Sequence, residues 1–141
     1  MINIAEYSAV LLAGIGLYIA GYFTFVYYGL LEANTRLMPR VCQLEDRSCK
    51  TVLGTRYARV FGVPNSLLGV VYYLIVIIVI LGGIKSGPTS VALIAVSWFT
   101  VALGLVLAYS LFFIIRIPCP LCLRAHAINL ALAVLLAVIL T

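Results

Sequence analysis

Charged side chains are scarce in this sequence. Asp and Glu together number 4 among 141 residues, and all charged residues make up only 9% of the chain. Soluble domains carry about 25% charged residues, so a chain that is 65% hydrophobic lacks the polar surface that a water-soluble fold needs. The low charge also excludes a disordered tail and a nucleic-acid-binding protein. With only 4 cysteines, the chain is not a secreted disulfide-rich mini-protein.

Long apolar runs take the place of the missing charges. They predict four membrane-spanning helices at about 7–31, 66–84, 90–115 and 120–140, each able to cross a hydrocarbon core of about 30 Å. The first run lacks a basic leader and a small-residue cleavage site, so we expect a retained span and not a signal peptide. The sequence therefore predicts a single-domain, all-α integral membrane protein: a four-helix transmembrane bundle with a polar connection at 32–63.

The basic residues are distributed unequally between the two sides of this bundle. One side carries eight of them, and the other carries Lys85 alone. The eight are Arg36, Arg40, Arg47, Lys50, Arg56, Arg59, Arg116 and Arg124. The positive-inside rule predicts that their side faces the cytoplasm. Alternatively, several of these arginines serve a functional site and do not report the topology.

A CxxC pair, Cys119 and Cys122, stands at the start of the fourth predicted span. Pro120 suits the first turn of a helix, which places both sulfurs on one face and within bonding reach. The unpaired N–H groups at a helix start stabilise a thiolate, so the pattern is typical of a reactive dithiol. Two inert cysteines packed in an apolar helix are the alternative.

A second pair, Cys42 and Cys49, lies in the polar connection. Closing or opening a loop of this size costs little chain entropy, although a static disulfide or two unrelated thiols fit the spacing as well. Both pairs fall on the same side of the membrane, which favours thiol–disulfide exchange between them. Four-cysteine zinc sites usually pair two short CxxC-type knuckles, so no metal site is predicted.

Several motifs, in this order along the chain, resemble the vitamin K epoxide reductase family. They are CQLEDRSC at 42–49, TRY at 55–57, FG at 61–62, NSLLG at 65–69, CPLC at 119–122 and AIN at 127–129. Members of this family are four-helix membrane thiol oxidoreductases, and the prokaryotic ones resemble DsbB-type disulfide generators in their task. In the DsbB type the CxxC pair precedes the loop pair, whereas here it comes last.

The resemblance implies roles for the cysteines. Cys119 and Cys122 match the active-site pair, with Cys122 nearest the quinone. Cys49 matches the loop cysteine that attacks Cys119, and Cys42 matches the one that meets the external thiol partner. Thr55 takes the place of the family's Ser or Thr near the catalytic pair.

The resemblance also implies a quinone site that contains Cys122. Asn65 matches a side chain that hydrogen-bonds one quinone carbonyl, and Leu53 and Leu68 are expected to contribute apolar contacts. His126 stands where the vertebrate enzymes have a tyrosine that hydrogen-bonds the ligand, a difference that disfavours vitamin K epoxide as the substrate. Taken alone, the asparagine could equally be a helix cap, and the histidine could make an interhelical hydrogen bond.

The segment 52–61 shows apolar residues at helical spacing opposite basic ones. This pattern predicts a short amphipathic helix on the membrane surface. Such a helix would cap the quinone site, although packing at the interface explains the pattern almost equally well.

Together these features predict an enzyme of the cell membrane that generates disulfides in a separate thioredoxin-fold, DsbA-like partner. Electrons would pass through Cys42/Cys49 and Cys119/Cys122 to a quinone of the ubiquinone or menaquinone type. Two alternatives are a true vitamin K epoxide reductase and a non-enzymatic membrane subunit with structural cysteines. The usual arrangement in the family puts the cysteines on the non-cytoplasmic face, opposite to the side that the charge count favours.

Overall fold

The computed structural model describes residues 3–28, 59–60, 63–115 and 120–141. Over these ranges it shows long helices and one short strand pair. The helices are α1 (Ile4–Tyr27), α4 (Asn65–Leu81), α5 (Pro88–Tyr109), the π-helical continuation η2 (Ser110–Ile115) and α6 (Pro120–Leu140). The strands β1 (Arg59–Val60) and β2 (Val63–Pro64) pair antiparallel.

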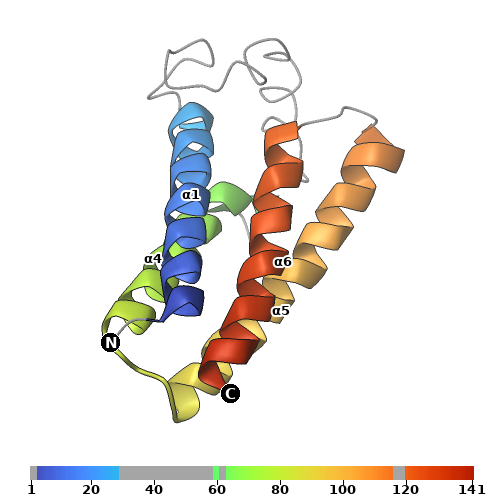
Figure 1. The fold of residues 1–141 in the computed structure, drawn as a ribbon. Coiled ribbons are helices and arrows are strands. Elements are labelled where there is room, and N and C mark those ends of the chain that lie inside the picture. Colours follow the sequence, from blue (N-terminus) through green and yellow to red (C-terminus); the bar gives the residue numbers. More distant parts are fainter. Residues whose placement is uncertain (1–2, 29–58, 61–62, 116–119) are drawn as a thin grey trace.

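The long helices alternate in direction along the chain (Figure 1). Both chain termini lie at one end of the bundle, while α4 and α6 begin toward the other end. Helix α1 packs against both α4 and α6, and α5 packs against α6. This arrangement confirms the predicted four-helix bundle.

Local sequence signals set the helix ends. At the start of α1, Asn3 and Glu6 form a reciprocal capping box: each backbone N–H donates to the other side chain at 3.0 Å. Between α4 and α5, Gly83 and Gly87 adopt positive φ angles of 70° and 90°, which favour glycine. Pro88 then begins α5, where its missing N–H costs no helical hydrogen bond.

The strand pair bears on the predicted amphipathic helix at 52–61. Arg59–Val60 is a strand that pairs with Val63–Pro64, so helical structure does not extend to Val60. The nearby Gly62 and Pro64 are poor helix formers, which fits the strand structure at Val60. The remainder of that segment lies outside the described residues.

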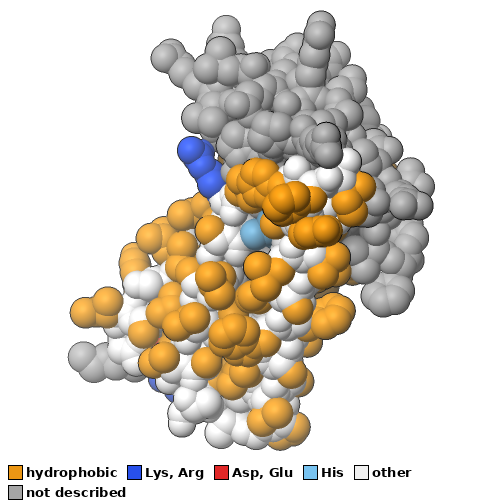
Figure 2. Space-filling model, turned by 90° about the vertical axis from the view of Figure 1, so that its right-hand side faces the viewer, with side chains coloured by type: hydrophobic (Ala, Val, Ile, Leu, Met, Phe, Trp, Pro, Cys, Tyr) orange, Lys and Arg blue, Asp and Glu red, His pale blue; other side chains and the backbone are white. Residues whose placement is uncertain are grey.

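The outer surface of the bundle is apolar. Figure 2 shows hydrophobic side chains across the described part of the face that α5 and α6 form, with Lys and Arg atoms only near its two ends. Large side chains such as Val91, Leu105 and Val138 are each 68% exposed. By length and composition, α1, α5 with η2, and α6 can cross a membrane. Helix α4, with 17 residues, measures about 25 Å at 1.5 Å per residue.

The interior combines small and branched side chains. Ala9 and Ala13 of α1, Val76 of α4, and Leu132 and Leu136 of α6 are all fully buried, at 0% exposure. Small residues let helix backbones approach closely, which matters in a membrane because association there depends on packing and hydrogen bonds. The protein is therefore a membrane protein whose helices contact one another through a tight, largely apolar core.

Candidate functional site

The structure describes four of the nine residues predicted to form the site: Cys122, His126, Asn65 and Leu68. The other five lie outside the described residues, and their predicted roles stay predictions. They are Cys42, Cys49, Leu53, Thr55 and Cys119. The described part of the site lies at the start of α6 and on the helices around it.

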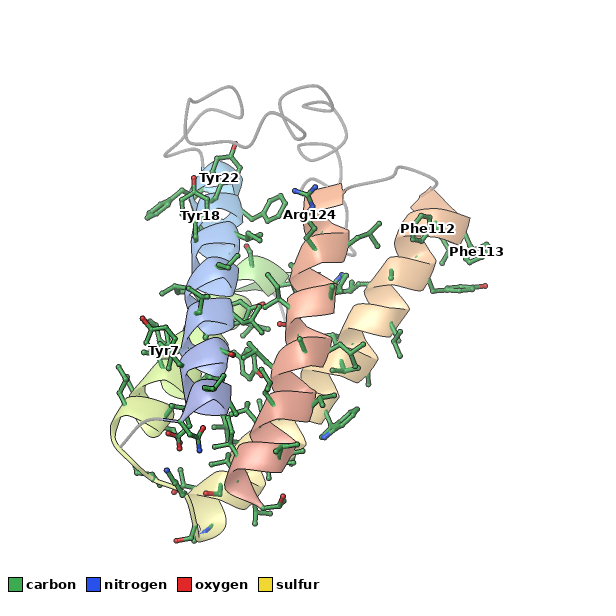
Figure 3. All side chains as sticks on the ribbon, in the orientation of Figure 1. Tyr7, Tyr18, Tyr22, Phe112, Phe113 and Arg124 are labelled. Atoms are coloured by element: carbon green, nitrogen blue, oxygen red, sulfur yellow. The ribbon has the colours of Figure 1, made fainter. Side chains whose placement is uncertain are left out.

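Cys122 lies in the first turn of α6, where it is half-buried. Residues four and seven positions further along a helix share its face, so His126 and Asn129 lie below it on the same side of α6. Arg124 is exposed at the start of the helix (Figure 3). Because residues two apart do not face each other on a helix, the arginine and the cysteine lie on different sides of α6.

His126 packs against α5 at Gly104, which is buried. A Cβ atom built on this glycine would lie 2.8 Å from Nδ1 of His126 and 3.3 Å from Cγ. The absent side chain therefore leaves a notch in α5, and the edge of the imidazole ring faces it. We call this feature the Gly104 notch.

Below His126, a buried hydrogen bond joins α4 to α6. The hydroxyl of Tyr73 donates to Oδ1 of Asn129 at 2.5 Å, and Tyr73 is only 2% exposed. The tyrosine ring lies over Gly16 of α1, where an added Cβ would approach Cζ of the ring to 2.5 Å. One tyrosine of α4 thus contacts two other helices, α1 and α6, directly beneath the half-buried cysteine and histidine.

Sequence reasoning missed this junction, since it assigned no chemistry to Tyr73 and quoted Asn129 only within a motif. A usable signal was present in the sequence. An asparagine inside an apolar span needs a partner, and Asn129 shares the helix face of His126 and Cys122. Its partner could not be identified from sequence, because several tyrosines occur in the other spans.

Asn65 and Leu68 lie in the first turn of α4. Asn65 is half-buried, whereas Leu68 is 38% exposed. A cavity of about 520 Å³ lies between this helix and α1, lined by apolar and aromatic side chains. The cavity borders Leu67 and Val70 of α4 but neither Asn65 nor Leu68. The predicted contacts of these two residues with a quinone stay predictions.

The described charges lie at the ends of the bundle. Arg124 is at the end where α6 begins, and Lys85 is in the turn between α4 and α5 at the other end. Lys85 forms an ion pair with Glu6, with Nζ and Oε1 2.5 Å apart. This contact balances the charge of Lys85, the single basic residue counted on the side of the chain termini.

Known proteins resemble this chain over most of its length. The sequence model of the vitamin K epoxide reductase family matches residues 7–137. Vitamin K epoxide reductase complex subunit 1 of Rattus norvegicus is 33% identical over 101 residues. That match covers 62% of this chain and 62% of the length of the rat protein.

Proposed function

Because this chain belongs to the vitamin K epoxide reductase family, we propose that it is a membrane thiol oxidoreductase that generates disulfide bonds in a partner protein. In this proposal Cys42 and Cys49 exchange with the partner, and Cys119 and Cys122 pass the electrons to a quinone. The partner is a separate thioredoxin-fold protein, and the enzyme is a multi-pass protein of the cell membrane.

One structural observation carries this proposal. A half-buried thiol, Cys122, shares the face of α6 with the imidazole of His126, at the end of an apolar bundle. Polar side chains inside a membrane bundle are costly and point to function. A quinone needs apolar surroundings with a few polar groups that orient its carbonyls. The residues at the start of α6 fit that requirement.

The electron transfer proceeds by thiol–disulfide exchange. Two thiols of the partner reduce the Cys42–Cys49 disulfide and leave as a disulfide. Cys49 then attacks Cys119, which breaks the Cys119–Cys122 bond and releases Cys122 as a thiolate. Attack of Cys42 on Cys49 restores the loop disulfide and frees Cys119. The CxxC pair returns to its disulfide as two electrons and two protons pass to the quinone, and quinol leaves.

The other residues of the site bind and orient the quinone in this proposal. His126 and Asn65 hydrogen-bond its two carbonyls, while Leu53 and Leu68 provide apolar contacts. Thr55 lies near the catalytic pair. Two considerations about sidedness oppose each other: the charge distribution favours a cytoplasmic site, and the usual arrangement in the family favours a non-cytoplasmic one.

Anaerobic quinone reduction by the purified protein with a dithiol donor tests the proposal. Wild type should form quinol, and Cys122→Ala should lose this activity completely because the electron-donating thiol is gone. Leu130→Ala is the matched control, since Leu130 lies on the same helix and is 49% exposed. Folded wild-type protein that gives no rate above the uncatalysed background, with several quinones, would refute the proposed function.

A second candidate is reduction of vitamin K epoxide, which the name of the rat relative favours. In that reaction the CxxC dithiol would be oxidised to a disulfide, and the epoxide oxygen would leave as water. Incubating the reduced protein with the epoxide and measuring the quinone product separates the two candidates. A protein that reduces quinones but leaves the epoxide unchanged excludes the second candidate and agrees with the first.

A further inference from the structure

Gly104 of α5 and His126 of α6 lie in close contact, 2.8 Å from the position of a built Cβ to Nδ1 of the imidazole. Gly104 lies inside α5, five residues before its last residue Tyr109, and η2 continues the helix to Ile115, so no turn requires a glycine here. Glycine in a helix interior is less favourable than alanine by about 1 kcal/mol. The space that a Cβ would occupy is taken by the imidazole, so the Gly104 notch accommodates the histidine ring.

The ring cannot easily move out of the way of a larger residue. A Cβ at position 104 would lie within 3.3 Å of Cγ as well as 2.8 Å from Nδ1. Cγ is the first ring atom, so only a change of the first side-chain torsion angle displaces it. Side chains prefer a few staggered torsion angles, and a new one would turn the whole imidazole.

The notch also fixes which edge of the imidazole ring faces α5. Nδ1, Cγ and Cε1 are the atoms nearest to the built Cβ, at 2.8, 3.3 and 3.6 Å. The edge that carries Nδ1 therefore faces α5. Nε2 lies further from the built Cβ than these three atoms, on the side of the ring away from Gly104.

We propose that Gly104 is a positioning residue that seats His126 against α5 and presents its Nε2 to a carbonyl of the quinone. This inference rests on the proposed function and adds a residue of α5 to the site. Substitution at position 104 should weaken quinone binding through the histidine. The thiol chemistry of the cysteines should continue once the quinone is bound.

Four variants test the inference: Gly104→Ala, His126→Ala, their combination, and Gly14→Ala as the control. No atom lies within 4 Å of a Cβ built on Gly14, so that variant adds a methyl group without a collision. Gly104→Ala should raise KM for the quinone by roughly three- to tenfold, the effect of losing one hydrogen bond. The kcat value should change little, because ground-state binding is what is lost.

The double variant distinguishes positioning from general damage. In the His126→Ala background, Gly104→Ala should leave KM unchanged because the ring that it displaces is already gone. An equal rise in KM in both backgrounds, or a similar rise with Gly14→Ala, would overturn the inference. Rescue adds a further check: His126→Gln, which places an amide nitrogen near Nε2, should retain more quinone affinity than His126→Asn.

Thermal unfolding gives a readout that does not depend on activity. Gly104→Ala should lower Tm in the wild-type background, where it collides with the ring. It should raise Tm in the His126→Ala background, since alanine then fits and favours the helix. If both Gly104 variants fail to fold, the methyl group collides with something other than His126 and the inference is wrong. An inactive wild type refutes the proposed function and the ligand role, whereas the Tm values still test the contact.

Discussion

Removing a single hydroxyl group, by Tyr73→Phe, tests whether the junction beneath the site holds the helices together. The hydroxyl donates to Oδ1 of Asn129 at 2.5 Å, and the tyrosine is 2% exposed. Hydrogen bonds between membrane helices contribute about 0.6 kcal/mol on average and up to about 1.7 kcal/mol. The short distance and deep burial place this bond near the upper value.

We therefore expect Tyr73→Phe to lower the free energy of unfolding by about 1.5 kcal/mol. That change corresponds to roughly a tenfold shift of the folding equilibrium. SDS-titrated unfolding of the purified protein in detergent micelles measures it. Tyr7→Phe is the control, because Tyr7 is 71% exposed. Loss of its hydroxyl should change the free energy of unfolding by no more than about 0.5 kcal/mol.

A double-mutant cycle with Asn129→Ala isolates the hydrogen bond from other effects of the substitutions. Once Asn129 is an alanine, Tyr73→Phe should cost almost nothing, since the acceptor is absent. If the tyrosine substitution costs the same in both backgrounds, the hydrogen bond does not stabilise the fold. The reasoning about the junction would then be refuted.

Two other contacts yield predictions of the same kind. Gly16→Ala should destabilise the bundle by about 1 to 3 kcal/mol through overpacking, since its Cβ would lie 2.5 Å from Cζ of Tyr73. In unfolding measurements, adding Tyr73→Leu to this variant should restore most of the lost stability. Glu6→Gln should lower Tm because it keeps a capping side chain but loses the ion pair with Lys85. Lys85→Arg, which keeps the charge, should leave Tm nearly unchanged, and an equal loss in both variants would contradict this account.

Much of the architecture could be predicted from sequence because its causes are local. Runs without charge predict membrane-spanning helices wherever they occur. Pro88 and the glycines of the preceding turn mark a helix start for reasons that depend on backbone sterics alone. The ordered cysteine motifs predicted the family, and the match over residues 7–137 confirmed it.

The candidate site was only partly predictable. The face that Cys122 and His126 share follows from their spacing on a helix. The glycine opposite the histidine could not be found in this way, because Gly104 is one of 11 glycines in the sequence. Which glycine meets the ring depends on how α5 and α6 are rotated and where they approach most closely.

Sequence alone thus determined that this protein resides in a membrane, how many long helices it has, and which family it belongs to. Hydrophobicity and motif spacing carry that information, and neither depends on distant contacts. Tertiary structure alone decided that Tyr73 reaches Asn129, 56 positions along the chain. It also decided that a glycine of α5 receives the imidazole. Both contacts arise from the rotation and separation of packed helices, which are set by all the side chains between them together.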